Sequence, residues 1–162
     1  MGKFQDIVSS SNPLSRNDND AANAQLEQIL SACENRDESA MKALFSKRTI
    51  DEAADLDETI TALFDFFQGE VMSYDDWGGP GVSAGMNEGG TGRHWKRIRS
   101  TYDVETSEQR YRFAIEGYTV HTFDPDSVGI SSLYVIKAED SDLSIAYWGD
   151  GKFTPGITIE QK

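Results

Sequence analysis

The spacing of hydrophobic residues divides the chain into a helical part and a strand-like part. Before Gly69, apolar residues recur at intervals of three and four, which is the period of one helix face. After Gly69 they alternate with polar residues, as in strands with one buried face. The sequence therefore predicts an α+β fold, in which N-terminal helices pack on a curved antiparallel sheet.

The helical part predicts three helices, at residues 21–35, 38–45 and 49–69. The third carries the longest apolar stripe, and we expect Phe64 and Phe67 at its end to lie against the sheet. Thr49 and Glu52 have the spacing of a capping box, and Gly69 is placed to end this helix. Residues 1–20 are rich in Ser, Asn and Asp and predict a flexible lead-in to a single domain at residues 21–162.

The strand-like part begins with a strand at residues 71–77. Half of the glycines follow at residues 78–92, which indicates either a long irregular loop or a bulged, bent strand pair. The next two strands match best when their turn centres on Thr106-Ser107, so that Tyr102 faces Tyr111 and Asp103 faces Arg110. In that register the basic run at residues 93–99 faces acidic partners on a solvated surface.

The last long hairpin is predicted to turn at residues 139–142, with Tyr134 opposite Tyr147. Both of its faces are apolar, so both need cover, one of them from the helices. For the other face we expect either a homodimer or burial under the N-terminal segment. The residues of that face are Leu133, Val135 and Trp148. A short edge strand at residues 155–159 completes the sheet.

Composition narrows the function classes. The net charge of −13 argues against a nucleic-acid partner, because phosphates would be repelled over most of the surface. No run of residues is long and apolar enough to predict a transmembrane segment. The single cysteine, Cys33, continues the apolar series of the first helix and is interpreted as a core residue. His94 and His121 lack metal-ligand spacing, so neither a metal site nor a cofactor is predicted.

Three stretches of the sequence read ALFSKRTIDEAADLDETITALFDFFQGEVMSYDDWGGPGVS, SLYVIKAED and YWGD. They resemble a family of small uncharacterised lipoproteins of Gram-positive bacteria, within the nuclear-transport-factor-like or cystatin-like superfamily. The resemblance implies a cone-shaped sheet packed on the central helix, with a cavity between them, and no established activity. It also implies lipid anchoring at the outer cell surface. This chain lacks the lipid-attachment cysteine and leader, so anchoring is expected of a parent protein.

Such a cavity would be lined by aromatic side chains from the sheet. The candidate ligand-binding residues are Trp77, Tyr102, Tyr111, Phe113, His121, Tyr134 and Tyr147. The tyrosines can equally be core residues with hydrogen-bonded hydroxyls. The function predicted is an extracellular binding or interaction module that uses either a small-ligand cavity between helix and sheet or the apolar face of the sheet. The alternative is a small cavity enzyme of the dehydratase or isomerase type, with Asp75, Asp76 or His121 as its acid-base group.

Overall fold

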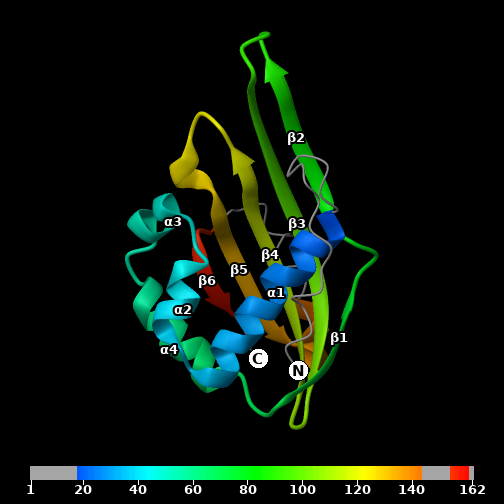
Figure 1. Ribbon diagram of the computed structural model, residues 1–162. Coiled ribbons are helices and arrows are strands. Elements are labelled where there is room, and N and C mark those ends of the chain that lie inside the picture. The colour runs from blue at the N-terminus through cyan, green and yellow to red at the C-terminus, as the bar shows by residue number, and fades with distance from the viewer. Residues whose placement is uncertain (1–17, 144–153, 161–162) are drawn as a thin grey trace.

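The computed structural model describes residues 18–143 and 154–160, and in these ranges it confirms an α+β fold. Helices occupy one face of a six-stranded sheet (Figure 1). The helices are α1 (Asp18–Asn35), α2 (Glu38–Ala43), α3 (Lys47–Glu52) and α4 (Leu56–Phe66). The strands are β1 (Val71–Asp76), β2 (Gly81–Glu88), β3 (Arg93–Thr106), β4 (Arg110–His121), β5 (Gly129–Lys137) and β6 (Gly156–Ile159). Helix α1 begins three residues before its predicted start, inside the predicted lead-in.

The sheet is mixed. Its strands follow the order β1-β3-β4-β5-β6, and β2 also pairs with β3. Every described pair is antiparallel except β5 with β6, which run parallel with Leu133 opposite Ile157. The edge strand expected at residues 155–159 is therefore confirmed, but a wholly antiparallel sheet is wrong. A parallel neighbour needs a long crossover, and residues 138–155 supply that length.

The single helix predicted at residues 49–69 is two helices. Ser46 begins α3, since its hydroxyl accepts the backbone N–H of Thr49 at 3.1 Å. Helix α3 ends at Glu52, and α4 starts at Leu56. A continuous helix would stack Asp51 and Asp55 on one side, four residues apart, where like charges repel. The break instead puts Asp57 and Glu58 in the first turn of a new helix, where the helix dipole favours anions.

The glycine-rich segment forms a broken edge strand, so the bent strand pair is confirmed and the irregular loop is wrong. β1 pairs with the second half of β3, from Thr106 to Tyr102, and β2 pairs with its first half, from Arg99 to Arg93. Gly78 and Gly79 lie between them with φ of +90° and +93°. These left-handed residues let the chain leave β3 and rejoin it.

The β3–β4 turn centres one residue later than predicted, which shifts the pairing by two residues. Tyr102 lies opposite Phe113, and Tyr111 lies opposite Val104. The hydroxyl oxygen of Thr106 accepts the backbone N–H of Gln109 at 2.9 Å and fixes this longer turn. A shift of two preserves the faces of both strands. The expected cross-strand charge pairs are therefore present, and Arg97 and Arg99 both lie 3.4 Å from Glu116.

The faces of β5 are the reverse of those predicted. Leu133 and Val135 are fully buried in the core beneath the helices, and Tyr134 is buried on the opposite face beside Ala114. A homodimer through Leu133 and Val135 is therefore wrong, because core side chains are not available to a second copy. Trp148 and Tyr147, together with the strand expected to pair with β5, lie outside the described residues.

The core fills the space between the helices and the sheet. Phe64 and Phe67 are 2% and 6% exposed, and the Phe67 ring meets Phe113 edge-on at 5.8 Å. The predicted contact of this helix end with the sheet is confirmed. Cys33 is also a core residue, and burial raises the pKa of its thiol to about 12. A thiol in that state is neither a nucleophile nor a metal ligand at neutral pH.

Candidate functional site

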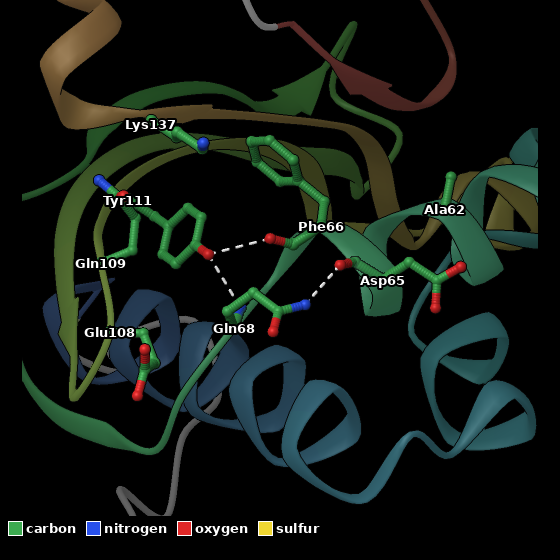
Figure 2. Close-up of a pocket in the computed structure, with 8 residues that line it drawn as sticks. All are labelled: Ala62, Asp65, Phe66, Gln68, Glu108, Gln109, Tyr111 and Lys137. Atoms are coloured by element: carbon green, nitrogen blue, oxygen red, sulfur yellow. Dashed lines mark hydrogen bonds between the residues drawn. The ribbon is translucent and has the colours of Figure 1, made fainter.

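An open pocket of about 640 Å³ lies where the C-terminal end of α4 meets the β3–β4 turn and the end of β5 (Figure 2). Its lining residues are Ala62, Asp65, Phe66, Gln68, Glu108, Gln109, Tyr111 and Lys137. Pockets of this size hold small ligands, and a few convergent polar groups commonly set their orientation. This pocket combines an aromatic wall with amides and charges of both signs.

Tyr111 joins the helix to the sheet at the pocket. Its hydroxyl donates to the carbonyl oxygen of Phe66 at 2.9 Å and accepts the backbone N–H of Gln68 at 2.8 Å. The phenol thereby satisfies backbone groups where α4 ends and the chain continues toward β1. Burial raises the pKa of Tyr111. The half-buried Phe66 ring forms the aromatic wall and meets the buried Tyr111 ring edge-on at 5.5 Å.

Lys137 differs from the other described cations. Nine lysines and arginines make ion pairs with carboxylates, and Arg93 lies over the Phe123 ring at 4.2 Å. Lys137, which is partly buried at the end of β5, makes neither contact with any residue that the structure describes. In a chain of net charge −13, its ammonium group remains open to an anion.

The predicted ligand-binding residues are not brought together. Tyr102, Tyr111 and Phe113 share the helix-covered face, are at most 1% exposed, and are packed in the core. Of these three, Tyr111 alone lines the pocket. Tyr134 lies on the opposite face of the sheet, beside Ala114.

The two remaining described candidates lie on the solvent side of the sheet. Trp77 is 50% exposed after the end of β1, with the Arg112 guanidinium 4.4 Å above its ring. His121 packs edge-on against Tyr118 at 4.9 Å and Phe123 at 4.5 Å. Neither Trp77 nor His121 lines this pocket.

The acid-base candidates are also placed elsewhere. Asp75 and Asp76 are exposed on the edge strand β1, and one Asp76 oxygen accepts the backbone N–H of Gly78 at 3.1 Å. His121 belongs to the aromatic group just described. None of the three lines the pocket. The expectation that Asp75 or Asp76 is buried beside Trp77 is wrong, because β1 is an edge strand with two of every three side chains exposed.

The carboxyl that is buried is Glu27, on the side of α1 that faces β1 and β3. One of its oxygens accepts the Tyr74 hydroxyl at 2.6 Å, and the other has no hydrogen-bond partner within the described chain. One turn earlier on α1, Asn23 accepts the Tyr102 hydroxyl at 2.8 Å. Burial raises the pKa of Glu27, and the Tyr74 hydrogen bond offsets part of that rise. Glu27 could not be identified from the sequence, because the helix period marks only the apolar residues of this helix.

We expect the protein to become less stable as pH rises, because Glu27 then loses its proton. Because its folded-state pKa lies above the unfolded value of 4.5, the folded chain holds this proton more tightly. The stabilisation is complete below pH 4.5 and is lost as pH rises through the folded-state pKa. Glu27→Gln, which cannot ionise, should lose less free energy of unfolding between pH 4 and pH 7.5 than the parent, measured by urea unfolding.

Tyr74→Phe is the matched variant for this prediction. It removes the hydrogen bond that lowers the pKa of Glu27 while leaving the carboxyl in place, so its loss of stability between pH 4 and pH 7.5 should exceed that of the parent. Parallel pH profiles for all three proteins would contradict the role given to Glu27.

The pocket's charged residues could not have been identified from their spacing. Glu108 lies in a turn and Lys137 ends an apolar strand, and both positions are ordinary for solvated residues. The one available signal was a lone cation directly after four apolar residues, Leu133 to Ile136. Only the pairing of Tyr111 with Lys137 across β4 and β5 shows that the two segments meet.

Comparisons with known proteins bear on the same region. No curated protein matches the chain. None of the described helices is both long enough and apolar enough to span a membrane. A family described as a domain of unknown function, DUF5104, matches residues 28–138, and all eight lining residues of the pocket fall within that match. The chain belongs to the DUF5104 family.

Proposed function

We propose that the protein is a binding module that holds a small, anion-bearing ligand in the pocket at the end of α4. The observation that carries this proposal is Lys137, a cation on the pocket wall with neither a carboxylate nor an aromatic partner in the described chain. A partly buried ammonium group gains more from a counter-ion than one in open water, because the local dielectric constant is lower.

The remaining lining residues support a small ligand. Phe66 offers apolar surface, and the amides of Gln68 and Gln109 can donate and accept hydrogen bonds at the pocket wall. The Gln68 amide nitrogen is already held by the carbonyl oxygen of Asp65 at 2.7 Å, so its carbonyl end is fixed in place. A pocket whose polar groups are held before binding loses less entropy when a ligand enters.

The second candidate function, a small cavity enzyme of the dehydratase or isomerase type, has less support. Such an enzyme needs an acid-base group within hydrogen-bond reach of its substrate. Asp75, Asp76 and His121 lie away from the pocket, and the buried carboxyl of Glu27 is not among its lining residues. The carboxylates that do line it, Asp65 and Glu108, are exposed to solvent.

Kinship with the cystatin-like superfamily and a place on the outer cell surface belong to the same proposal. Both rest on the resemblance of the sequence, and the arrangement of helices on one face of a largely antiparallel sheet supports the first. If the parent protein is anchored outside the cell, it should sediment with membranes and be digested by protease added to intact cells. Recovery in the soluble cell interior would contradict that location.

We expect Lys137→Met to weaken anion binding about tenfold, the effect of losing about 1.4 kcal/mol from a charged contact. The methionine keeps most of the apolar stem and removes the charge. The measurement is titration of labelled protein with phenylacetate, and with phosphate as a second probe, followed by amide chemical shifts in NMR spectra. Shifts should concentrate at residues 62–68, 108–111 and 137.

Lys47→Met is the charge-matched control. Lys47 is exposed on α3, where it pairs with Asp51, and it does not line the pocket. This variant should bind as the parent does. Equal affinities of the parent and Lys137→Met, or shifts centred elsewhere in the chain, would overturn the proposed function.

A further inference from the structure

We infer that the ligand of this pocket is a zwitterion of the amino-acid type, either a free amino acid with an apolar side chain or a short peptide with free ends. The inference rests on the proposed function and adds the chemistry of the ligand. It is drawn from the separation of charge across the pocket and from the apolar side chains in its lining.

The positive and negative groups occupy different sides of the pocket. Figure 2 shows Lys137 on one side of the Tyr111 ring and Glu108 on the other. Glu108 makes no ion pair with a described residue, whereas Asp65, the other carboxylate of the lining, is paired with Arg36. The pocket lining therefore includes one cation and one carboxylate that have no ion-pair partner among the described residues.

Glu108 alone supplies the negative side. The end of α4 does not add to it, because the Arg36 guanidinium donates to the carbonyl oxygen of Phe64 at 2.9 Å and pairs with Asp65. An anionic ligand attracted by Lys137 meets repulsion from Glu108. A cationic ligand meets repulsion from Lys137. A molecule with a carboxylate at one end and an ammonium group at the other satisfies both sides.

The pocket lining is partly apolar. Its apolar side chains with accessible surface are the half-buried Phe66 and the exposed Ala62, both from α4. An apolar side chain on the ligand would cover this surface. The pocket volume of about 640 Å³ exceeds the need of one amino acid and leaves room for a second residue.

The test compares four probes on the full chain by isothermal titration: leucine, leucyl-leucine, N-acetyl-leucine and leucinamide. The first two keep both charges, the third lacks the ammonium group, and the fourth lacks the carboxylate. We expect leucine or leucyl-leucine to bind at least tenfold more tightly than either blocked probe. Whichever of leucine and leucyl-leucine binds more tightly shows whether an amino acid or a peptide is the better ligand.

Two variants assign the charges to their ends. Lys137→Met should lower the affinity for leucine, leucyl-leucine and N-acetyl-leucine but leave the affinity for leucinamide unchanged. Glu108→Gln should lower the affinity for leucine, leucyl-leucine and leucinamide but leave the affinity for N-acetyl-leucine unchanged. Glu58→Gln, an exposed carboxylate in the first turn of α4, is the control for Glu108→Gln and should leave all four affinities unchanged.

The outcomes separate this inference from the proposed function. If N-acetyl-leucine binds as tightly as leucine and still depends on Lys137, the pocket takes anions and the zwitterion is overturned. If leucinamide binds as tightly as leucine, the anion anchor at Lys137 is overturned as well. If no probe binds, the amino-acid class is overturned, while phenylacetate and phosphate still decide the proposed function.

Discussion

Replacing Gly117 by alanine should lower the free energy of unfolding by about 3 kcal/mol, the upper range for overpacking a close-packed interior. A Cβ atom at Gly117 would lie 2.3 Å from the carbonyl oxygen of Gly129 and 2.9 Å from Cα of Ile130. Both are backbone atoms of the neighbouring chain segment, so no side-chain rotation relieves the contact. Urea unfolding followed by circular dichroism measures the change.

Gly81→Ala is the control within the same sheet. Its nearest neighbour would be the carbonyl oxygen of Arg99 at 3.8 Å, which is ordinary contact, and its φ is not in the left-handed region. This substitution should be neutral or slightly stabilising, because alanine reduces the conformational freedom of the unfolded chain. Equal stabilities for the two variants would show that β4 and β5 are not packed this closely.

The close approach at Gly117 also positions the helices. Gly129 itself lies against Ser46, and a Cβ atom there would come within 2.7 Å of the Ser46 backbone nitrogen. The same Ser46 N–H donates to the carbonyl oxygen of Ile130 at 3.0 Å, and the Ile130 N–H donates to Leu44 at 2.9 Å. These contacts attach the connection between α2 and α3 to the start of β5. They hold the helical layer against the sheet at the end opposite the pocket.

The periodicity of the sequence was sufficient to predict the layers of this fold. The change of period at Gly69 marks the boundary between helices and strands, and Phe64 and Phe67 pack on the sheet as expected. The register between β3 and β4 could not be predicted as well from the sequence. The hydrogen bond from the Gln109 backbone to Thr106 moved the turn by one residue, and that choice has no signature in the alternation of apolar and polar residues.

The errors share one physical cause, which is that spacing records which residues are buried but not which layer covers them. Leu133 and Tyr134 are both buried, on opposite faces of β5, and the sequence does not tell which face the helices cover. The pocket escaped prediction for a related reason. Glu108 precedes Tyr111 by three residues, and Tyr111 pairs with Lys137, so the proximity of the two charges depends on the register between β4 and β5.

Phe113→Ala should lower the free energy of unfolding by about 4 kcal/mol, the usual cost of removing a buried phenylalanine. The side chain is fully buried in the core and meets Phe67 at 5.8 Å. The space left by its removal would be closed off from water by the surrounding core, so both packing and transfer free energy are lost. Urea unfolding of Phe113→Ala and Phe113→Leu should show a graded loss, smaller for leucine.

Trp77→Ala is the contrasting variant, because both aromatic residues were predicted to line one cavity. Trp77 is 50% exposed, and the Arg112 guanidinium lies above its ring, a surface interaction of about 1 kcal/mol or less. Trp77→Ala should therefore lower the free energy of unfolding only slightly, although tryptophan is a larger side chain than phenylalanine. If Phe113→Ala instead kept parental stability, the residue would border open space, and the cavity between helix and sheet that the sequence suggested would replace the packed core described above.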